Sequence, residues 1–277
     1  MQLPKTRTLT AHIVGELVYY TFPSLEGLPS VRHGFSTRLG GVSQPPFDSM
    51  NLSFTRGDDP AAVTENFRRF CDVLGATPEQ VVISAQTHTA NVRAVGREAC
   101  GSGVTRERDY TDVDGLVTDE PGVLLCTQYA DCVPLLFADP VKGVVATAHS
   151  GWRGTVQRIG AVTVEKMCAD YGCRREDIRA AVGPSIGPCC FEVDEPVYAA
   201  FSKMEEWEDG ACARFKTGGK LDLHLWEVNR RVLLAAGIRP EHLTVTDLCT
   251  RCHPELFWSH RVCGATRGSL AAFIMKV

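Results

Sequence analysis

Three residues suited to binding a metal ion, His88, Cys132 and His149, lie at the ends of short apolar runs. VVISAQ comes just before His88, VLLCTQYA and VPLLFADP lie on either side of Cys132, and GVVATA comes before His149. Such runs are typical of buried strands, whose ends are rigid positions for catalytic side chains. Two imidazoles and a thiolate match the three protein ligands of a catalytic zinc ion, which keeps its fourth position open. The spacing therefore predicts a zinc site, although an isolated His or Cys at a strand end is more often structural.

The segment after His149 is suited to binding an anion. It runs Ser150-Gly151-Trp152-Arg153-Gly154 and leads into a helical pattern. Its glycines let the backbone approach a ligand, and the start of a helix offers free N–H groups to a phosphate. Arg153 adds a bidentate donor. The same residues also fit a plain strand-to-helix turn with Trp152 buried, and the two interpretations are compatible.

The elements that must position these residues follow from periodicity and from start and stop signals. Helices are predicted from Asp59-Pro60 to Gly75, from after Gly154 to Gly172, from Asp194, and from near Asp222 to Gly237. Strands are predicted at 81–86, 91–95, 114–118, 123–130, 133–140, 143–150, 178–183, 242–248 and 270–277, and surface loops at 100–112 and 205–220. Hairpins mixed with isolated helices favour the α+β class, with mixed sheets in one domain over residues 1–277.

The bulk composition excludes some partners and compartments. The 277 residues are 44% hydrophobic and 22% charged, which is ordinary for a globular protein. A net charge of −4 gives no general attraction to nucleic acid or to an anionic membrane. The N-terminus lacks the apolar core of a signal peptide, so the 12 cysteines are expected to be reduced thiols in the cytoplasm.

Several blocks together resemble the YfiH/laccase-domain family. They are HGFSTRLGGVS, SMNLSF, GDDPAAVTENFRRF, QTHTANV, DGLVTD, ADCVPLLFADP, AHSGWRGTV, VGPSIGPCCFEV and DLCTRCHPELFWSHR, in the family's order over about residues 31–277. That family was long described as multicopper polyphenol oxidoreductases and is now associated with zinc-dependent purine nucleoside phosphorylases. The resemblance implies a single-domain layered α/β/β/α sandwich that acts as a monomer.

The resemblance also implies the site and its reaction. His88, Cys132 and His149 stand at the family's metal positions, where zinc is expected and copper is an alternative. The implied reaction cleaves adenosine, inosine and guanosine with phosphate to give ribose 1-phosphate and the free base. Cleavage of methylthioadenosine and deamination of adenosine are implied side activities. Thr89, Ser150 and the run His260 to Cys263 depart from the family's usual residues.

Further residues are candidates for contacts with substrate. Arginines are suited to phosphate or ribose, and Arg38 is favoured because it lies in the glycine-rich turn TRLGG. Asn51 either binds substrate or caps its own turn, and Asp131 is a candidate to orient a ligand histidine. The remaining candidates are Arg153, Arg261, Arg267 and Cys190.

Other interpretations of the chain remain open. Cys249-x-x-Cys252 is half of a structural zinc motif, but a second such pair is absent from the sequence. A copper oxidase would need many paired histidines, and the 8 in this chain contain no His-x-His pair. A hydrolase with Cys132 as nucleophile, acting in the editing of peptidoglycan precursors, would not depend on a metal. A chelator therefore distinguishes that hydrolase from the zinc enzyme.

Overall fold

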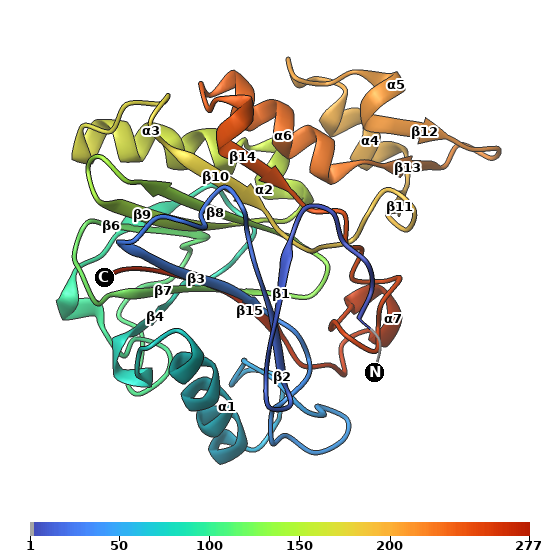
Figure 1. Cartoon of the computed structure of the whole chain (residues 1–277). Coiled ribbons are helices and arrows are strands. Elements are labelled where there is room, and N and C mark those ends of the chain that lie inside the picture. The colour runs from blue at the N-terminus through green and yellow to red at the C-terminus, as the bar shows by residue number, and fades with distance from the viewer. Residues whose placement is uncertain (1–2) are drawn as a thin grey trace.

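Two six-stranded sheets lie face to face in the computed structural model, which describes residues 3–277 (Figure 1). β7 and β15 of the first sheet pack against β9 of the second. The strand order of the first sheet is β1 (Thr10–Val14), β2 (Leu17–Thr21), β3 (Val31–Ser36), β15 (Leu270–Lys276), β7 (Leu124–Tyr129) and β4 (Val81–Ile83). The order of the second is β14 (Leu243–Val245), β10 (Arg179–Val182), β8 (Val133–Asp139), β9 (Val144–Ser150), β6 (Gly115–Thr118) and β5 (Val92–Ala94).

Helices cover the outer faces of both sheets and complete four layers. α1 (Pro60–Val73) lies on the first sheet, and α3 (Ile159–Tyr171) and α6 (Leu225–Ala235) lie on the second (Figure 1). Short elements fill the connections: α2 (Trp152–Val156), α4 (Glu195–Phe201), α5 (Asp209–Cys212), α7 (His260–Cys263), and a small sheet of β11 (Glu192–Val193), β13 (Leu221–Leu223) and β12 (Ala213–Phe215). Both large sheets contain parallel and antiparallel pairs. The prediction of a layered α/β/β/α sandwich with mixed sheets is confirmed.

The continuously apolar strands are explained by burial on both faces. In β15, Leu270, Ala272 and Ile274 enter the core between the sheets. The alternate residues Ala271, Phe273 and Met275 enter the core beneath α1. A central strand covered on both faces therefore needs apolar residues at successive positions, which is the pattern of β15.

The predicted first helix is confirmed, and its ends have local causes. The Asp59 carboxylate accepts a hydrogen bond from the Ala61 amide at 3.0 Å, which satisfies one free donor of the first turn. Pro60 occupies the first helical position, where its missing N–H costs nothing. Gly75 follows with a φ of +67°, a conformation that favours glycine.

Other boundaries differ from the predictions. The second helix begins at Trp152 rather than after Gly154, and Arg158 interrupts it with a φ of +58°. The fourth begins at Leu225, because Asp222 pairs within β13. The expected loop 205–220 contains α5 and β12, and the strands of the first 36 residues were not predicted.

Two expectations concern the whole chain. The predicted domain 1–277 includes Met1 and Gln2, which lie outside the described residues. Within residues 3–277, no helix has the length and apolar character needed to cross a bilayer.

Candidate metal site and its pocket

The structure brings His88, Cys132 and His149 together at one edge of the sandwich. One ligand atom from each of these residues lies within 4.8 Å of the other two. Cys132 lies where the chain passes from β7 in the first sheet to β8 in the second. His149 lies near the end of β9, opposite Pro134 of β8. The pairing of these strands therefore sets the distance between the thiol and the imidazole.

A buried carboxylate that the sequence analysis missed organises two of the three residues. Asp114 directly precedes β6 and is fully buried. Its Oδ1 accepts a hydrogen bond from His149 Nδ1 at 2.8 Å, which leaves Nε2 free for a metal ion. The same carboxylate accepts hydrogen bonds from the backbone amides of Thr87, His88 and Thr89, at N···O distances of 2.9 to 3.1 Å. These amides hold His88 at a φ of +67°, an unusual conformation that persists only where surroundings impose it.

Neighbouring charges favour the ionised forms of these groups. Burial alone would raise the pKa of Cys132, but the imidazoles of His149 and His88 outweigh it and lower that pKa. Burial likewise opposes protonation of His149, yet Cys132 and Asp114 raise its pKa. Burial would raise the pKa of Asp114, but hydrogen bonds from His149, Thr89 and Thr87 lower it to about 2. Cys132 is thus favoured as a thiolate, the form that binds metal ions.

Gly151 allows the three residues to converge. A Cβ atom added there would lie 3.0 Å from His88 Cδ2 and 3.1 Å from Cys132 Sγ. Its φ of −61° suits any residue, so the need for glycine is steric. Gly151, the first glycine of the block AHSGWRGTV, therefore allows the site to assemble.

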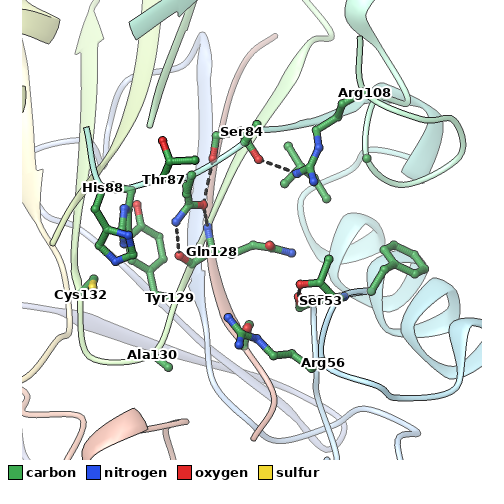
Figure 2. Close-up of a pocket in the computed structure, with 18 of the residues that line it drawn as sticks. Ser53, Arg56, Ser84, Thr87, His88, Arg108, Gln128, Tyr129, Ala130 and Cys132 are labelled. Carbon is green, nitrogen blue, oxygen red and sulfur yellow. Dashed lines mark hydrogen bonds between the residues drawn. The ribbon is translucent and has the colours of Figure 1, made fainter. Parts of the chain in front are cut away.

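The three residues line one wall of a pocket of about 410 Å³. In Figure 2, His88 and Cys132 lie on one side, and Arg56, Arg108 and Ser53 lie across the cavity. Two glutamines that line the pocket are hydrogen-bonded to each other: Gln86 Nε2 donates to the backbone carbonyl of Gln128 at 2.7 Å. Further lining residues include Ser84, Thr87, Asp112, Tyr129, Arg267 and Ser269.

Three arginines that line this pocket make it cationic. Arg56 and Arg108 are exposed, whereas Arg267 is 8% exposed. Burial and the nearby charge of Arg56 lower the pKa of Arg267 to about 10, so it still carries its charge at neutral pH. Of the three, only Arg267 was a candidate in the sequence analysis. Arg56 lies between the blocks SMNLSF and GDDPAAVTENFRRF, which was an available signal.

Arg38, the favoured anion holder, does not line this pocket. Its guanidinium donates to the Asp48 carbonyl at 2.8 Å and to the Pro254 carbonyl at 2.9 Å. It also stacks on Trp258, 3.8 Å from the ring centroid. Its donors therefore hold two loops together.

Asn51 is likewise a structural residue. It is fully buried, accepts hydrogen bonds from the Ser53 and Ser269 amides, and donates to Asp58. Of the two roles considered, the structure supports the cap of the local turn. Because Ser53 and Ser269 line the pocket, Asn51 shapes the pocket wall from behind.

Three other candidates, Arg153, Arg261 and Asp131, have partners outside the pocket. Arg153 is exposed and stacks on Trp152 at 4.3 Å from the ring centroid. Arg261 donates to the Glu192 carbonyl at 3.2 Å. Neither lines the pocket. Asp131 accepts hydrogen bonds from Thr250, Ser259 and the Arg261 amide, and Asp114 instead orients the ligand histidine.

Cys190, another candidate for a contact with substrate, does not line the pocket either. Its sulfur lies 3.5 Å from that of Cys252, in a second group of cysteines. Thr89, which differs from the residue usual in the resembled family, supports the site, because its hydroxyl donates a hydrogen bond to Asp114 at 3.1 Å.

Comparison with known proteins identifies the family. A family model described as multi-copper polyphenol oxidoreductase laccase matches residues 32–277. Purine nucleoside phosphorylase YlmD from Geobacillus stearothermophilus is 39% identical over 245 residues, which cover 87% of this chain and 88% of the relative. Adenosine deaminase RL5 from an unknown prokaryotic organism is 34% identical over 247 residues, which cover 88% of this chain and 92% of the relative.

A solved structure supports the same conclusion. The crystal structure of hypothetical protein YfiH from Bacillus licheniformis matches with a TM-score of 0.89 and 34% identity, over 95% of this chain and 97% of that one. The resemblance inferred from the motifs is thereby confirmed. This chain belongs to the multi-copper polyphenol oxidoreductase laccase family, the YfiH/laccase-domain family of the sequence comparison.

Proposed function

We propose that this protein is a zinc-dependent purine nucleoside phosphorylase that cleaves adenosine, inosine and guanosine. The observation that supports this most is the arrangement of the pocket, which three candidate metal ligands and three arginines line together; Figure 2 shows Arg56 and Arg108 across the cavity from His88 and Cys132. A phosphorolytic site must hold an anion beside the sugar, and this pocket offers cationic donors. The names of relatives at 39% and 32% identity, YlmD and YfiH, support the same substrate class.

The donor set fits one zinc ion. His88, Cys132 and His149 are the proposed ligands, and their ligand atoms lie within 4.8 Å of one another. Asp114 fixes the His149 tautomer, as carboxylates do behind many zinc-bound histidines. Zinc bound there supplies a Lewis acid that polarises a substrate oxygen. Two histidines and one cysteine provide ligands for one ion and not for a multicopper cluster; copper in place of zinc is tested by metal analysis.

The remaining steps belong to the side chains of the pocket. Arg56, Arg108 and Arg267 bind the phosphate, because guanidinium groups form charge-assisted hydrogen bonds with its oxygens. Gln128 lies between His88 and the two labelled arginines in Figure 2, and Ser53 lies beside Arg56; both side chains line the pocket and are proposed to contact ribose hydroxyls. The pocket thereby orients phosphate toward the anomeric carbon, and orientation alone contributes strongly to the rate.

Product analysis tests this function. Purified protein of known metal content is incubated with adenosine and with inosine, with and without phosphate. We expect release of adenine and hypoxanthine only with phosphate, and none from a folded His149→Ala variant. Intact nucleosides despite zinc bound at His88, Cys132 and His149 would overturn the proposal and favour the peptidoglycan-precursor hydrolase. Turnover that persists after the metal has been removed by a chelator would contradict the zinc dependence.

A second activity, deamination of adenosine, is supported by the relative named adenosine deaminase RL5. Inosine formed from adenosine in the absence of phosphate measures it in the same incubations.

A further inference from the structure

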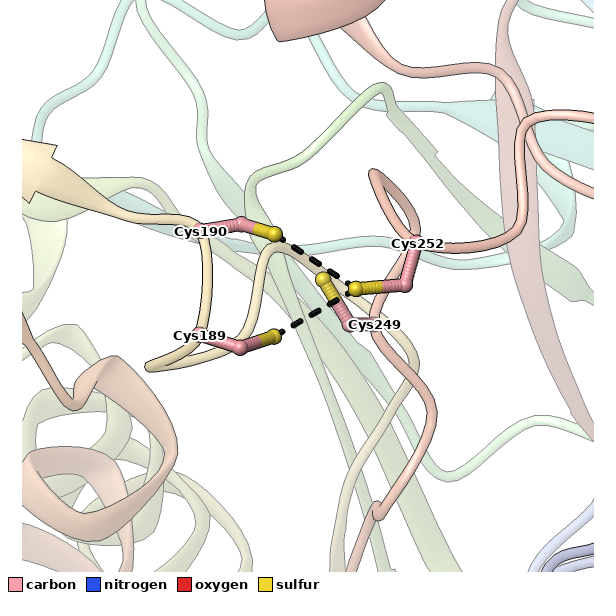
Figure 3. A group of neighbouring side chains, drawn as sticks. All are labelled: Cys189, Cys190, Cys249 and Cys252. Atoms are coloured by element: carbon pink, nitrogen blue, oxygen red, sulfur yellow. Dashed lines mark hydrogen bonds between the residues drawn. The ribbon is translucent and has the colours of Figure 1, made fainter.

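Four cysteines outside the pocket converge on one point. The sulfur atoms of Cys189, Cys190, Cys249 and Cys252 all lie within 4.8 Å of one another. Figure 3 shows the four side chains pointing toward a common centre from two separate loops. Cys252 Sγ lies 3.5 Å from both Cys189 Sγ and Cys190 Sγ. One sulfur at equal distance from two others suits ligands around a shared ion better than a single pair about to form a disulfide.

The spacing fits a single tetrahedral ion. Zinc–sulfur bonds of about 2.3 Å place the sulfurs of a tetrahedron about 3.8 Å apart. The observed distances, from 3.5 Å for the two hydrogen-bonded pairs up to a limit of 4.8 Å, bracket that value. An iron–sulfur cluster would hold the cysteine sulfurs farther apart, because the cluster itself lies between them.

The surroundings are also those of thiolate ligands. The Gly187 amide donates to Cys249 Sγ at 3.2 Å, and Arg251 Nη1 donates to Cys190 Sγ at 3.3 Å. Such donors around the sulfurs stabilise the thiolates, which are the form that binds metal ions. Cys189 and Cys252 are exposed, so an ion reaches the site directly from solvent.

We propose that Cys189, Cys190, Cys249 and Cys252 bind one zinc ion as a closed structural site. Four protein sulfurs complete the tetrahedron and leave no position for substrate, as in other Cys₄ zinc sites. None of the four lines the pocket, so the proposal is independent of the reaction proposed above.

The ion would crosslink two loops that pack behind the Cys132 turn. Cys189 and Cys190 belong to the loop after β10, and Cys249 and Cys252 to the segment after β14. The loops already meet where the Thr250 amide donates to the Ser185 carbonyl at 3.0 Å. Thr250 also donates to Asp131 at 2.6 Å, and Asp131 directly precedes Cys132. Binding zinc therefore stabilises the packing behind the Cys132 turn.

Metal analysis of the full chain, purified with a reductant, tests the site. Cys189→Ser and Cys252→Ser change exposed thiols, so both variants are expected to fold. Each should lose one zinc per chain relative to the wild type and melt at a lower temperature. Cys168→Ser changes a half-buried thiol of α3 that belongs to neither group; it is the control and should keep the wild-type zinc content.

Cobalt substitution separates this site from the one in the pocket. Sulfur-to-cobalt charge transfer should fall strongly in Cys252→Ser and only slightly in Cys132→Ser, because Cys132 supplies a single thiolate. Unchanged metal content and spectra in both Cys189→Ser and Cys252→Ser would overturn the proposal. A purified wild type with two fewer free thiols than the 12 in the chain, and with a disulfide mapped within the group, would also overturn it.

Discussion

The two groups of metal-ligand side chains in this protein differ in number, support and surroundings. His88, Cys132 and His149 offer three ligand atoms and face a pocket of about 410 Å³. They are supported by strand pairing and by the buried carboxylate of Asp114. The four cysteines Cys189, Cys190, Cys249 and Cys252 come from two loops and lie outside that pocket.

The difference indicates distinct roles for the two groups. A set of three protein ligands beside a cavity leaves a coordination position for a reacting molecule, whereas four thiolates leave none. The first group is accordingly proposed to perform chemistry and the second to hold loops together. Changes in the first group should therefore affect activity more than stability, and changes in the second should do the reverse.

The largest effect is expected from Cys132→Ser. Loss of the thiolate removes a metal ligand, and the ion's stabilisation of the transition state is worth several kcal/mol. Phosphorolysis should fall by about 10³-fold or more, which corresponds to roughly 4 kcal/mol, with little change in melting temperature. Steady-state kinetics and zinc analysis measure this, with Cys168→Ser as the control. An unchanged zinc content in Cys132→Ser would show that Cys132 is not a ligand.

Asp114→Asn should have the next largest effect. The amide cannot accept all the hydrogen bonds that the carboxylate accepts, so His149 and the His88 turn lose their fixed orientation. Loss of such supporting contacts typically costs about 10- to 100-fold in metal affinity or activity. Zinc titration against a competing chelator measures the affinity. Wild-type affinity and activity in this variant would contradict the proposed role of Asp114.

Gly151→Ala should produce a smaller loss without removing any ligand. The added methyl group lies 3.0 to 3.1 Å from atoms of His88 and Cys132, so these side chains must move by a few tenths of an ångström. Activity should fall by about tenfold, because small displacements weaken catalysis strongly. The matched control is Gly210→Ala, where an added Cβ meets no atom within 4 Å. Equal activity in the two variants would argue against a close approach of the three residues.

The smallest effect is expected from Arg56→Ala. Arg56 is exposed, so its contribution to phosphate binding is about 1 kcal/mol, and the KM for phosphate should rise about fivefold. Arg38→Ala is the comparison, since its donors are used by the Asp48 and Pro254 carbonyls. It should lower the melting temperature and leave the phosphate KM unchanged. A raised phosphate KM in Arg38→Ala alone would restore the original assignment.

Local patterns predicted the elements well where they depend on neighbouring residues. The start of α1 was predicted because Asp59 and Pro60 are typical residues of a helix start. The strands β7, β8, β9 and β15 were predicted because burial on two faces requires continuous apolar runs. β1, β2 and β3 were missed; β1 is an exposed edge strand, so burial imposes no apolar pattern on its residues.

Contacts distant in sequence were not predictable in the same way. Asp131 was proposed to orient a histidine because it adjoins Cys132. Its backbone has a φ of +83°, and its carboxylate accepts hydrogen bonds from Thr250 and Ser259 instead. Asp114, 35 residues before His149, performs that role through the pairing of β6 with β9. The neighbours of Cys249 and Cys252 are Cys189 and Cys190, about 60 positions earlier in the chain, and no local pattern pairs the two segments.

The sequence by itself determined the layered fold class, the family and the choice of His88, Cys132 and His149 as candidate ligands, which the fold brings together. Those features follow from residue types and from periodicities that act over a few positions. The tertiary structure decided which carboxylate supports the site, which arginines face the pocket and which cysteines meet. Each of these depends on strand register and loop packing, where one step of the chain turns a side chain to the opposite face.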